Sequence, residues 1–209
     1  MKDAISLLIL GAGGHAKVVA DAARAAGVAS ITFCDEGAGE TLERCAQGAT
    51  HIHVAIGDNA VRVGGLARGR ACGLSPYTVV HPSAYVAPSA RVGEGVYIGA
   101  FCVINPESVI EDCAVVNTGA IVEHDCRVGE GAFIAPGAIM CGGCSIGTRS
   151  MLGAHATMIP QTHIGDEIVV GAGATVVEDF FEKCTVVGTP ARKTPLKENN
   201  KAHGRYPNE

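Results

Sequence analysis

The sequence predicts an α/β unit followed by an all-β parallel solenoid, and three observations carry this prediction. Strand-like and helix-like segments alternate through residues 1–80, which is typical of a small parallel sheet. Residues 81–176 divide into six-residue blocks with no insertion and no remainder. Hydrophobic residues make up 47% of the chain but aromatic residues only 4%, so we expect a core of regular aliphatic layers.

The N-terminal unit is predicted to be a small βαβαβ fold. The segments AISLLIL, SITFCDEG and HIHVAIGDN are expected to form strands, and GHAKVVADAARAAG an amphipathic helix that ends at Gly27. A later helix is expected to end near Cys72. Gly11, Gly13 and Ala16 satisfy the loose GxGxxA pattern of a Rossmann-like nucleotide-binding turn.

This turn favours a mononucleotide site. About 75 residues make only one half of a dinucleotide fold, which suffices for a diphosphate at the helix N-terminus beyond Gly14. The carboxylates of Asp35 and Glu36 are expected near the ribose or the base. For His15 two roles stay open, a cap on the helix start and a contact with the diphosphate or the sugar. A plain tight turn is the alternative for the whole loop.

The six-residue period predicts a triangular solenoid. Every sixth residue is Val, Ile, Leu or Met, and the residue two positions earlier is nearly always Ala, Ser, Cys or Thr. Neither the helical period of 3.6 nor the strand period of 2 explains this spacing. Three blocks would close one coil, and coils stacked about 4.8 Å apart would place residue n next to residue n+18. Gly, Asn and Asp at block starts are expected to provide the tight backbone of the corners.

One block of the solenoid carries candidate catalytic residues. The block EHDCRV is the only one of the sixteen in which a histidine, His124, lies between carboxylates, those of Glu123 and Asp125. A solvated polar corner is the simple interpretation. The catalytic alternative makes His124 a general base, either carboxylate its orienting partner, and the N–H of Gly142, one coil further on, the donor for an oxyanion.

Composition excludes several classes of protein. The net charge of −5, without a basic run, is not typical of nucleic-acid binding. The apolar run near the N-terminus is too short to span a bilayer, so we expect a soluble, cytoplasmic protein. Nine scattered cysteines favour reduced thiols, and Cys102, Cys126 and Cys144 fall at the small interior position. The CxxC of Cys141 and Cys144 has no second pair, so no metal is expected.

The repeat and five further motifs resemble known protein families. The block pattern is similar to that of hexapeptide-repeat acyltransferases, whose fold is a left-handed parallel β-helix. The motifs GAGGHAKVV, CDE, AIGDN, NTGAIVEHDC and VVGTPAR, between residues 5 and 193, together resemble the bacterial nucleotide-sugar acetyltransferases of the PglD/NeuD-like family. This resemblance implies acetyl-CoA-dependent N-acetylation of a UDP-linked 4-amino-4,6-dideoxy sugar. It also implies a homotrimer with active sites between subunits.

The resemblance implies a role for each matched residue. His124 would be the general base, Asp125 would raise its basicity, Asn117 would lie beside the acceptor amine, and the N–H of Gly142 would receive the oxyanion. The residues implied for the nucleotide sugar are Gly13, Gly14, His15, Asp35, Glu36 and Gly57. Those implied for CoA are Phe133, Ala154, Ala172, Arg192 and Lys193. Family members often have a histidine where this chain has Phe133, a departure that weakens the polar contact expected there.

The expected organisation is a nucleotide-sugar-binding domain at 1–78, a β-helix acetyltransferase domain at 79–193 and a polar tail at 194–209. Two other acetylations fit the same pattern, O-acetylation of a sialic-acid-type sugar and N-acetylation of a GDP-linked amino sugar. Two other classes also remain, a γ-type carbonic anhydrase with three zinc histidines and a purely structural or nucleotide-sensing solenoid.

Overall fold

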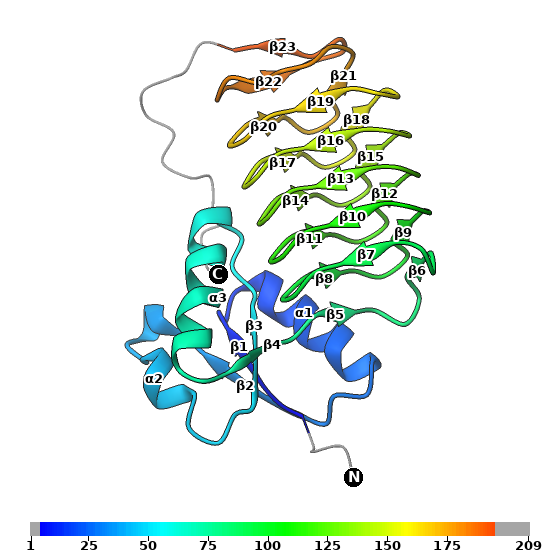
Figure 1. Cartoon of the computed structure of the whole chain (residues 1–209). Coiled ribbons are helices and arrows are strands. Elements are labelled where there is room, and N and C mark those ends of the chain that lie inside the picture. Colours follow the sequence, from blue (N-terminus) through cyan, green and yellow to red (C-terminus); the bar gives the residue numbers. More distant parts are fainter. Residues whose placement is uncertain (1–4, 195–209) are drawn as a thin grey trace.

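The computed structural model describes residues 5–194, and its N-terminal part is a four-stranded parallel sheet (Figure 1). The strands lie in the order β2-β1-β3-β4. Their bounds are β1 (Ser6–Leu10), β2 (Ser30–Cys34), β3 (His51–Val54) and β4 (Ser75–Pro76). The apolar run of β1 is buried because this strand is central and covered on both faces. The predicted parallel sheet is confirmed, although β4 was not expected.

Four helical segments accompany the sheet: α1 (Gly14–Ala25), the 3₁₀ helix η1 (Glu36–Ala38), α2 (Leu42–Cys45) and α3 (Asn59–Ala71). The helix α1 ends just before Gly27, whose φ of 91° lies in the left-handed region that favours glycine. The helix α3 begins at an Asp58 cap, whose side chain accepts a hydrogen bond from the Val61 N–H. The short η1 and α2 were not predicted.

The second part of the chain is a parallel solenoid in which each of the sixteen blocks ends in a two-residue strand (Figure 1). One further strand, β5 (Val79–Val80), precedes the blocks. The block strands are β6 (Tyr85–Val86), β7 (Arg91–Val92), β8 (Tyr97–Ile98), β9 (Val103–Ile104), β10 (Val109–Ile110), β11 (Val115–Val116), β12 (Ile121–Val122), β13 (Arg127–Val128), β14 (Phe133–Ile134), β15 (Ile139–Met140), β16 (Ser145–Ile146), β17 (Met151–Leu152), β18 (Thr157–Met158), β19 (His163–Ile164), β20 (Val169–Val170) and β21 (Thr175–Val176). The solenoid ends in β22 (Thr185–Val187) and the antiparallel β23 (Arg192–Lys193).

Three sheets form the faces of the solenoid, and successive block strands belong to them in turn. The first face runs from β5 through β8, β11, β14, β17 and β20 to β22 and β23; the second runs from β6 to β21; the third runs from β7 to β19. Val115, for example, pairs with Phe133, and Ile121 with Ile139, so the predicted n to n+18 register is confirmed. The last residue of each strand fills the interior, together with the small residue two positions earlier.

The glycines at the block starts have a different role from the one predicted, which was to provide the tight backbone of the corners. The left-handed residue stands at the third position of the block, as in Gly119 (φ 68°) and Asp125 (φ 59°), and not at the block start. Glycine at the block start instead allows close stacking, since a Cβ on Gly153 would lie 2.6 Å from the Ala172 nitrogen of the next coil. The corner geometry therefore tolerates Asp125 without glycine.

The N-terminal sheet and the solenoid share a core. Apolar residues of α1, among them Val19, pack with Val79, Tyr97 and Val115 on the outer side of the first face. No helix among residues 5–194 is long and apolar enough to cross a membrane. Residues 195–209 of the predicted tail lie outside the described part of the chain.

Candidate active site

The nucleotide-binding residues predicted from the sequence converge on one cleft of about 360 Å³. Its walls are the glycine turn after β1, the end of β2 and the end of β3, because parallel strands place their carboxyl ends at the same edge of the sheet. All six predicted residues line it: Gly13, Gly14, His15, Asp35, Glu36 and Gly57. The glycine turn also packs closely against the backbone just after β3, since a Cβ on Gly11 would lie 2.8 Å from the Ala55 carbonyl oxygen.

The two carboxylates in this cleft have different surroundings. Asp35 accepts a hydrogen bond from the Gly37 N–H at 3.0 Å and caps η1. Glu36 is bound by both terminal nitrogens of Arg68, with Nη1 to Oε2 at 3.1 Å. The hydrogen bond from Arg68 lowers the pKa of Glu36. Glu36 therefore lines the cleft as one half of an ion pair, whereas Asp35 does so as part of a turn.

His15 lies where the cleft meets the solenoid. Its ring packs edge-on against Tyr97, with centroids 5.4 Å apart, and lies 6.1 Å from the ring of Phe133. Burial lowers its pKa to about 4, with smaller contributions from the nearby His53 and Arg62. Its Nε2 is buried and has no hydrogen-bond partner within the described residues. The imidazole is therefore neutral near pH 7, and its Nε2 does not cap the helix.

A second cavity, of about 340 Å³, continues from the cleft onto the solenoid. Gly14, His15, Val18 and Gly57 line it from the N-terminal side, and Asn117, Thr118, Phe133 and Pro136 from the solenoid side. The Asn117 Oδ1 accepts a hydrogen bond from the Thr118 N–H at 2.8 Å. The structure thus brings Asn117 next to the predicted nucleotide site. Thr118 and Pro136 were not predicted, although they are one coil apart and so belong to one corner column.

The predicted catalytic triplet lies at an open corner of the solenoid. The His124 Nδ1 and the Asp125 Oδ2 are 2.8 Å apart, and the side chains of His124 and Asp125 are 62% and 64% exposed. Glu123 instead accepts a hydrogen bond from the Asn105 Nδ2 at 2.9 Å. A Cβ on Gly142 would lie 2.6 Å from both Cε1 and Nε2 of His124. The imidazole therefore lies directly against Gly142, with Asp125 on its other nitrogen.

Asn117 and His124 occupy different corners of the triangle. Asn117 follows β11 at the corner between the first and second faces, whereas His124 follows β12 at the corner between the second and third faces. The cavity beside His15 includes Asn117 but not His124. One chain therefore does not bring the two residues together.

The residues predicted for CoA are distributed over several places. Ala154 and Ala172 continue the corner column of Thr118 and Pro136, and the Gly173 N–H donates to the Ala154 carbonyl at 2.8 Å. Phe133 lies apart from this column, on β14 and against His15. At the end of the solenoid both predicted cations are paired, Arg192 with Glu178 at 3.0 Å and Lys193 with Glu182 at 2.8 Å.

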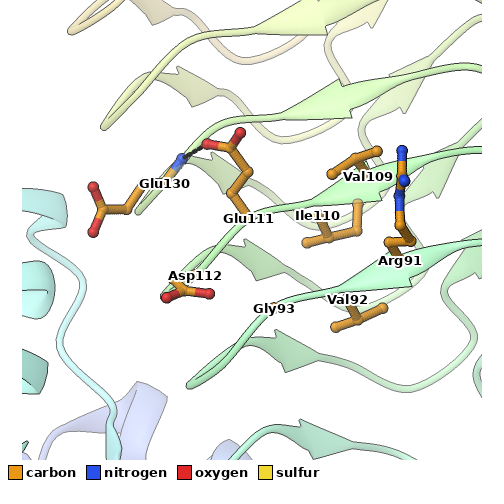
Figure 2. Close-up of a pocket in the computed structure, with 8 residues that line it drawn as sticks. All are labelled: Arg91, Val92, Gly93, Val109, Ile110, Glu111, Asp112 and Glu130. Atoms are coloured by element: carbon orange, nitrogen blue, oxygen red, sulfur yellow. Dashed lines mark hydrogen bonds between the residues drawn. The ribbon is translucent and has the colours of Figure 1, made fainter.

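A shallow groove of about 430 Å³ crosses the third face, where Figure 2 shows its lining. It contains Arg91, Val92, Gly93, Val109, Ile110, Glu111, Asp112 and Glu130. The Glu130 N–H donates to the Glu111 carboxylate at 3.0 Å. Because its charged lining is predominantly acidic, this groove does not suit the phosphates of a nucleotide or of CoA.

Six of the nine cysteines are buried core residues. Cys126 donates to the Cys141 carbonyl at 3.1 Å, and burial raises the pKa of Cys102 to about 11. Within the described residues, Cys34, Glu40 and Cys45 place potential ligand atoms within 4.8 Å of one another. Burial raises the pKa of the Cys34 thiol to about 12, and this group offers three ligand atoms where a structural zinc site has four. No histidine belongs to such a group within residues 5–194, which does not favour the carbonic anhydrase alternative.

Comparison with known proteins agrees with this architecture. The PglD N-terminal domain family matches residues 6–64, and the hexapeptide repeat of succinyl-transferase matches residues 143–178. Acyl-(acyl-carrier-protein)–UDP-N-acetylglucosamine O-acyltransferase of Bartonella quintana is 51% identical over 41 residues, 19% of this chain. That match spans only 15% of the relative's own length.

Solved structures are similar over nearly the whole chain. PerB from Caulobacter crescentus, in complex with CoA and GDP-perosamine, is 39% identical with a TM-score of 0.87, covering 91% of this chain and 97% of that one. The acetyltransferase domain of PglB from Neisseria gonorrhoeae, in complex with acetyl coenzyme A, is 35% identical with a TM-score of 0.85, covering 90% and 98%. WeeI from Acinetobacter baumannii is 25% identical with a TM-score of 0.84, covering 91% and 100%.

The stacked hexapeptide coils, together with the hexapeptide-repeat match, define the class of hexapeptide-repeat acyltransferases. Within it, the N-terminal match and the similarity to PerB and PglB show that the chain belongs to the PglD/NeuD-like nucleotide-sugar acetyltransferases. The chain is therefore an acetyltransferase, as the sequence predicted.

Proposed function

We propose that this enzyme transfers the acetyl group of acetyl-CoA to the amino group of a nucleotide-linked 4-amino-4,6-dideoxy sugar. The observation that carries the proposal is the continuous path from the nucleotide cleft to the cavity at Asn117. A nucleoside diphosphate in the cleft would extend its sugar past His15 toward the solenoid. Val18, Phe133 and Pro136 give that cavity an apolar wall, which suits a sugar with a methyl group in place of a hydroxymethyl group.

The nucleotide is either UDP or GDP. The relative PerB was solved with GDP-perosamine, and UDP is implied by the family resemblance. The diphosphate would lie on the N–H groups at the start of α1, beyond Gly13 and Gly14, where a helix N-terminus favours an anion. The Asp35 carboxylate would accept from ribose hydroxyls, since Glu36 is already bound by Arg68.

His124 would act as the general base. With Nδ1–H donating to Asp125, its Nε2 carries the free lone pair and lies against Gly142. The sugar amine attacks the thioester carbonyl carbon while Nε2 takes a proton from its nitrogen. The Gly142 N–H donates to the oxyanion of the tetrahedral intermediate. When the carbon–sulfur bond breaks, the imidazolium returns the proton to the CoA sulfur, leaving the amide and CoA.

Acetyl-CoA would run along the corner column that contains Thr118, Pro136, Ala154 and Ala172. Small side chains in this column leave room for the pantetheine chain, which is uncharged. The column leads toward β23, where Arg192 and Lys193 could exchange their carboxylate partners for CoA phosphates. PerB and the PglB domain were solved with CoA and acetyl coenzyme A respectively.

A homotrimer would complete the active site. The outer side of the second face carries an apolar stripe of Tyr85, Val103, Ile121 and Ile139, all at least partly exposed in the single chain. Such a stripe marks a surface for another protein. Because the second face lies between the corners of Asn117 and His124, a neighbour packed on it would stand beside both. We expect the Asn117 corner of one subunit to meet the His124 corner of the next. We also expect this enzyme to act in the cytoplasm.

A screen of acceptors tests this proposal. Purified protein is incubated with acetyl-CoA and one acceptor at a time, either a UDP- or GDP-linked sugar with or without an amine or a sialic-acid-type sugar, and free CoA thiol is measured. We expect CoA release with a nucleotide-linked amino sugar alone. Release with a sialic-acid-type sugar, and none with amino sugars, would instead establish the O-acetyltransferase alternative.

A further inference from the structure

Arg62 is a buried cation of α3 that the proposed chemistry does not use. Its side chain is 1% exposed, and all its hydrogen bonds go to uncharged oxygens. These are Nε to the Cys113 carbonyl (3.0 Å), Nη1 to the Ile56 (3.0 Å) and Gly57 (3.5 Å) carbonyls, and Nη2 to the Asn59 Oδ1 (2.8 Å) and the Gly131 carbonyl (2.7 Å). A guanidinium has five N–H donors in a rigid fork, so each donor has an acceptor.

On the solenoid side, the acceptors follow the coil repeat. Cys113 and Gly131 are one coil apart, and both hold the left-handed third position of their block. Asn59 extends the series, because its Nδ2 donates at 2.8 Å to the carbonyl of Arg149 on the next coil. Within the described residues these three carbonyls accept no backbone N–H. Arg62 and Asn59 therefore satisfy corner carbonyls of three successive coils.

On the other side, Arg62 contacts the walls of both substrate cavities. Ile56 and Gly57 line the nucleotide cleft, and Gly57 also lines the cavity beyond it. The Arg62 Cζ lies 5.6 Å from the centroid of the Phe133 ring, within the range of a cation–π contact. Phe133 in turn faces His15. One rigid guanidinium thus connects the loop after β3, the solenoid corners and the ring of Phe133 in the second cavity.

We propose that Arg62 is a positioning residue that fixes the nucleotide cleft relative to the acceptor-sugar cavity at Asn117. This inference rests on the proposed function, since it concerns the same substrate. Lysine cannot take over the role, because an ammonium lacks the planar fork needed to reach acceptors on opposite sides. A small error in this geometry would affect a ligand that spans both cavities more than one that fills the cleft alone.

The test compares Arg62→Lys with Arg70→Lys, a matched change on the same helix at an exposed residue that pairs with Glu94 and Asp112. Binding of acetyl-CoA, of UDP and GDP, and of the nucleotide-linked amino sugar is measured by calorimetry, and KM and kcat by CoA release. For Arg62→Lys we expect the amino-sugar KM and Kd to rise about tenfold or more, with acetyl-CoA and free nucleotide changed by about threefold or less. Arg70→Lys should match the parent.

A purely structural Arg62 would give a different result. In that case Arg62→Lys would lower the melting temperature but leave the Kd and KM for the nucleotide-linked amino sugar within about twofold of the parent, which would overturn the inference. Asn59→Ala provides a milder variant if Arg62→Lys does not fold. It removes the hydrogen bonds to the Arg149 and Ser150 carbonyls and one acceptor of Arg62, and should raise the same two constants by a smaller factor.

Binding without turnover separates this inference from the proposed function. A parent protein that binds the nucleotide-linked amino sugar, loses affinity on Arg62→Lys and yet transfers no acetyl group contradicts the proposed function alone. A parent that transfers acetyl groups, with unchanged sugar binding in Arg62→Lys and Asn59→Ala, contradicts the positioning role alone. A parent that binds none of the amino-sugar nucleotides contradicts both.

Discussion

The nucleotide cleft and the catalytic corner differ in how far a single chain completes them. The cleft gathers all six predicted residues from three strand ends, and it contains the half-buried, neutral His15. The corner presents the His124 and Asp125 side chains to solvent, and within residues 5–194 these side chains are positioned by their mutual hydrogen bond and by the close approach of Gly142 to the His124 ring. We therefore expect one chain to bind the nucleotide, and we expect the proposed chemistry to need a second surface. Variants should separate the two.

Replacing His124 by alanine should have the largest effect. Without the general base, kcat should fall about a thousandfold, while UDP or GDP binding should stay at the parent value because the cleft is on another part of the chain. His163→Ala serves as the control, since His163 lies on the third face and contacts Ser145. Acetyl transfer and calorimetric binding are measured for both. Appreciable activity in His124→Ala would assign the base to another residue.

Ile121→Lys should disrupt the proposed trimer and leave the nucleotide cleft of each chain intact. A charge in the middle of the apolar stripe would be desolvated by a packed neighbour, so we expect trimers to dissociate and activity to fall about a hundredfold, with nucleotide binding retained. Val61→Lys is a control on an exposed valine of α3. Sedimentation velocity gives the oligomeric state. A monomeric parent with full activity would show that one chain is sufficient.

Gly142→Ala should disturb the corner more subtly. The added Cβ would lie 2.6 Å from the His124 ring, so the imidazole must move away from Asp125 or from the oxyanion donor. We expect kcat to fall about tenfold to a hundredfold with little change in the nucleotide-sugar KM. Gly64→Ala is the matched control, because a Cβ there meets nothing within 4 Å. Equal activity of the two variants would remove Gly142 from the site.

The strands of the solenoid were predicted more completely than those of the N-terminal unit, because the six-residue pattern recurs in sixteen blocks and each block indicates the same geometry. Each block strand and the contact between His124 and Gly142 follow from the six-residue frame. The role of the block-start glycines did not follow, since close stacking and a positive φ both select glycine. Asp125 as the partner of His124 was favoured but not settled by sequence, because Asn105, which binds Glu123, lies one coil away.

The cleft was predictable from strand ends, but the junction between the two parts was not. Arg62 belongs to a helix whose other arginines, Arg68 and Arg70, are exposed. The sequence of this helix does not indicate that Arg62 alone among them is buried. Its burial depends on carbonyls of the solenoid corners, which local sequence does not reveal. The second cavity was missed for the same reason, since Val18 and Pro136 meet only when the helix docks on the solenoid.

A separate expected effect concerns pH and tests through stability how well the cleft excludes water. Burial lowers the pKa of His15 and of His53 to about 4, from 6.5 in an exposed histidine. Between these values the unfolded chain binds protons that the folded chain does not. Stability is therefore full above about pH 6.5 and falls as the pH drops toward 4, by up to about 1.4 kcal/mol per pH unit for each histidine.

Urea unfolding at several pH values between 7 and 4.5 measures this slope. In His15→Asn the contribution of one histidine is removed, so the free energy of unfolding should fall less steeply with decreasing pH than in the parent. Val61→Asn, an exchange at an exposed residue of α3 without a titratable group, should keep the parent slope. If His15→Asn and Val61→Asn show the same slope, then burial does not hold His15 neutral, and the cleft would be open to water.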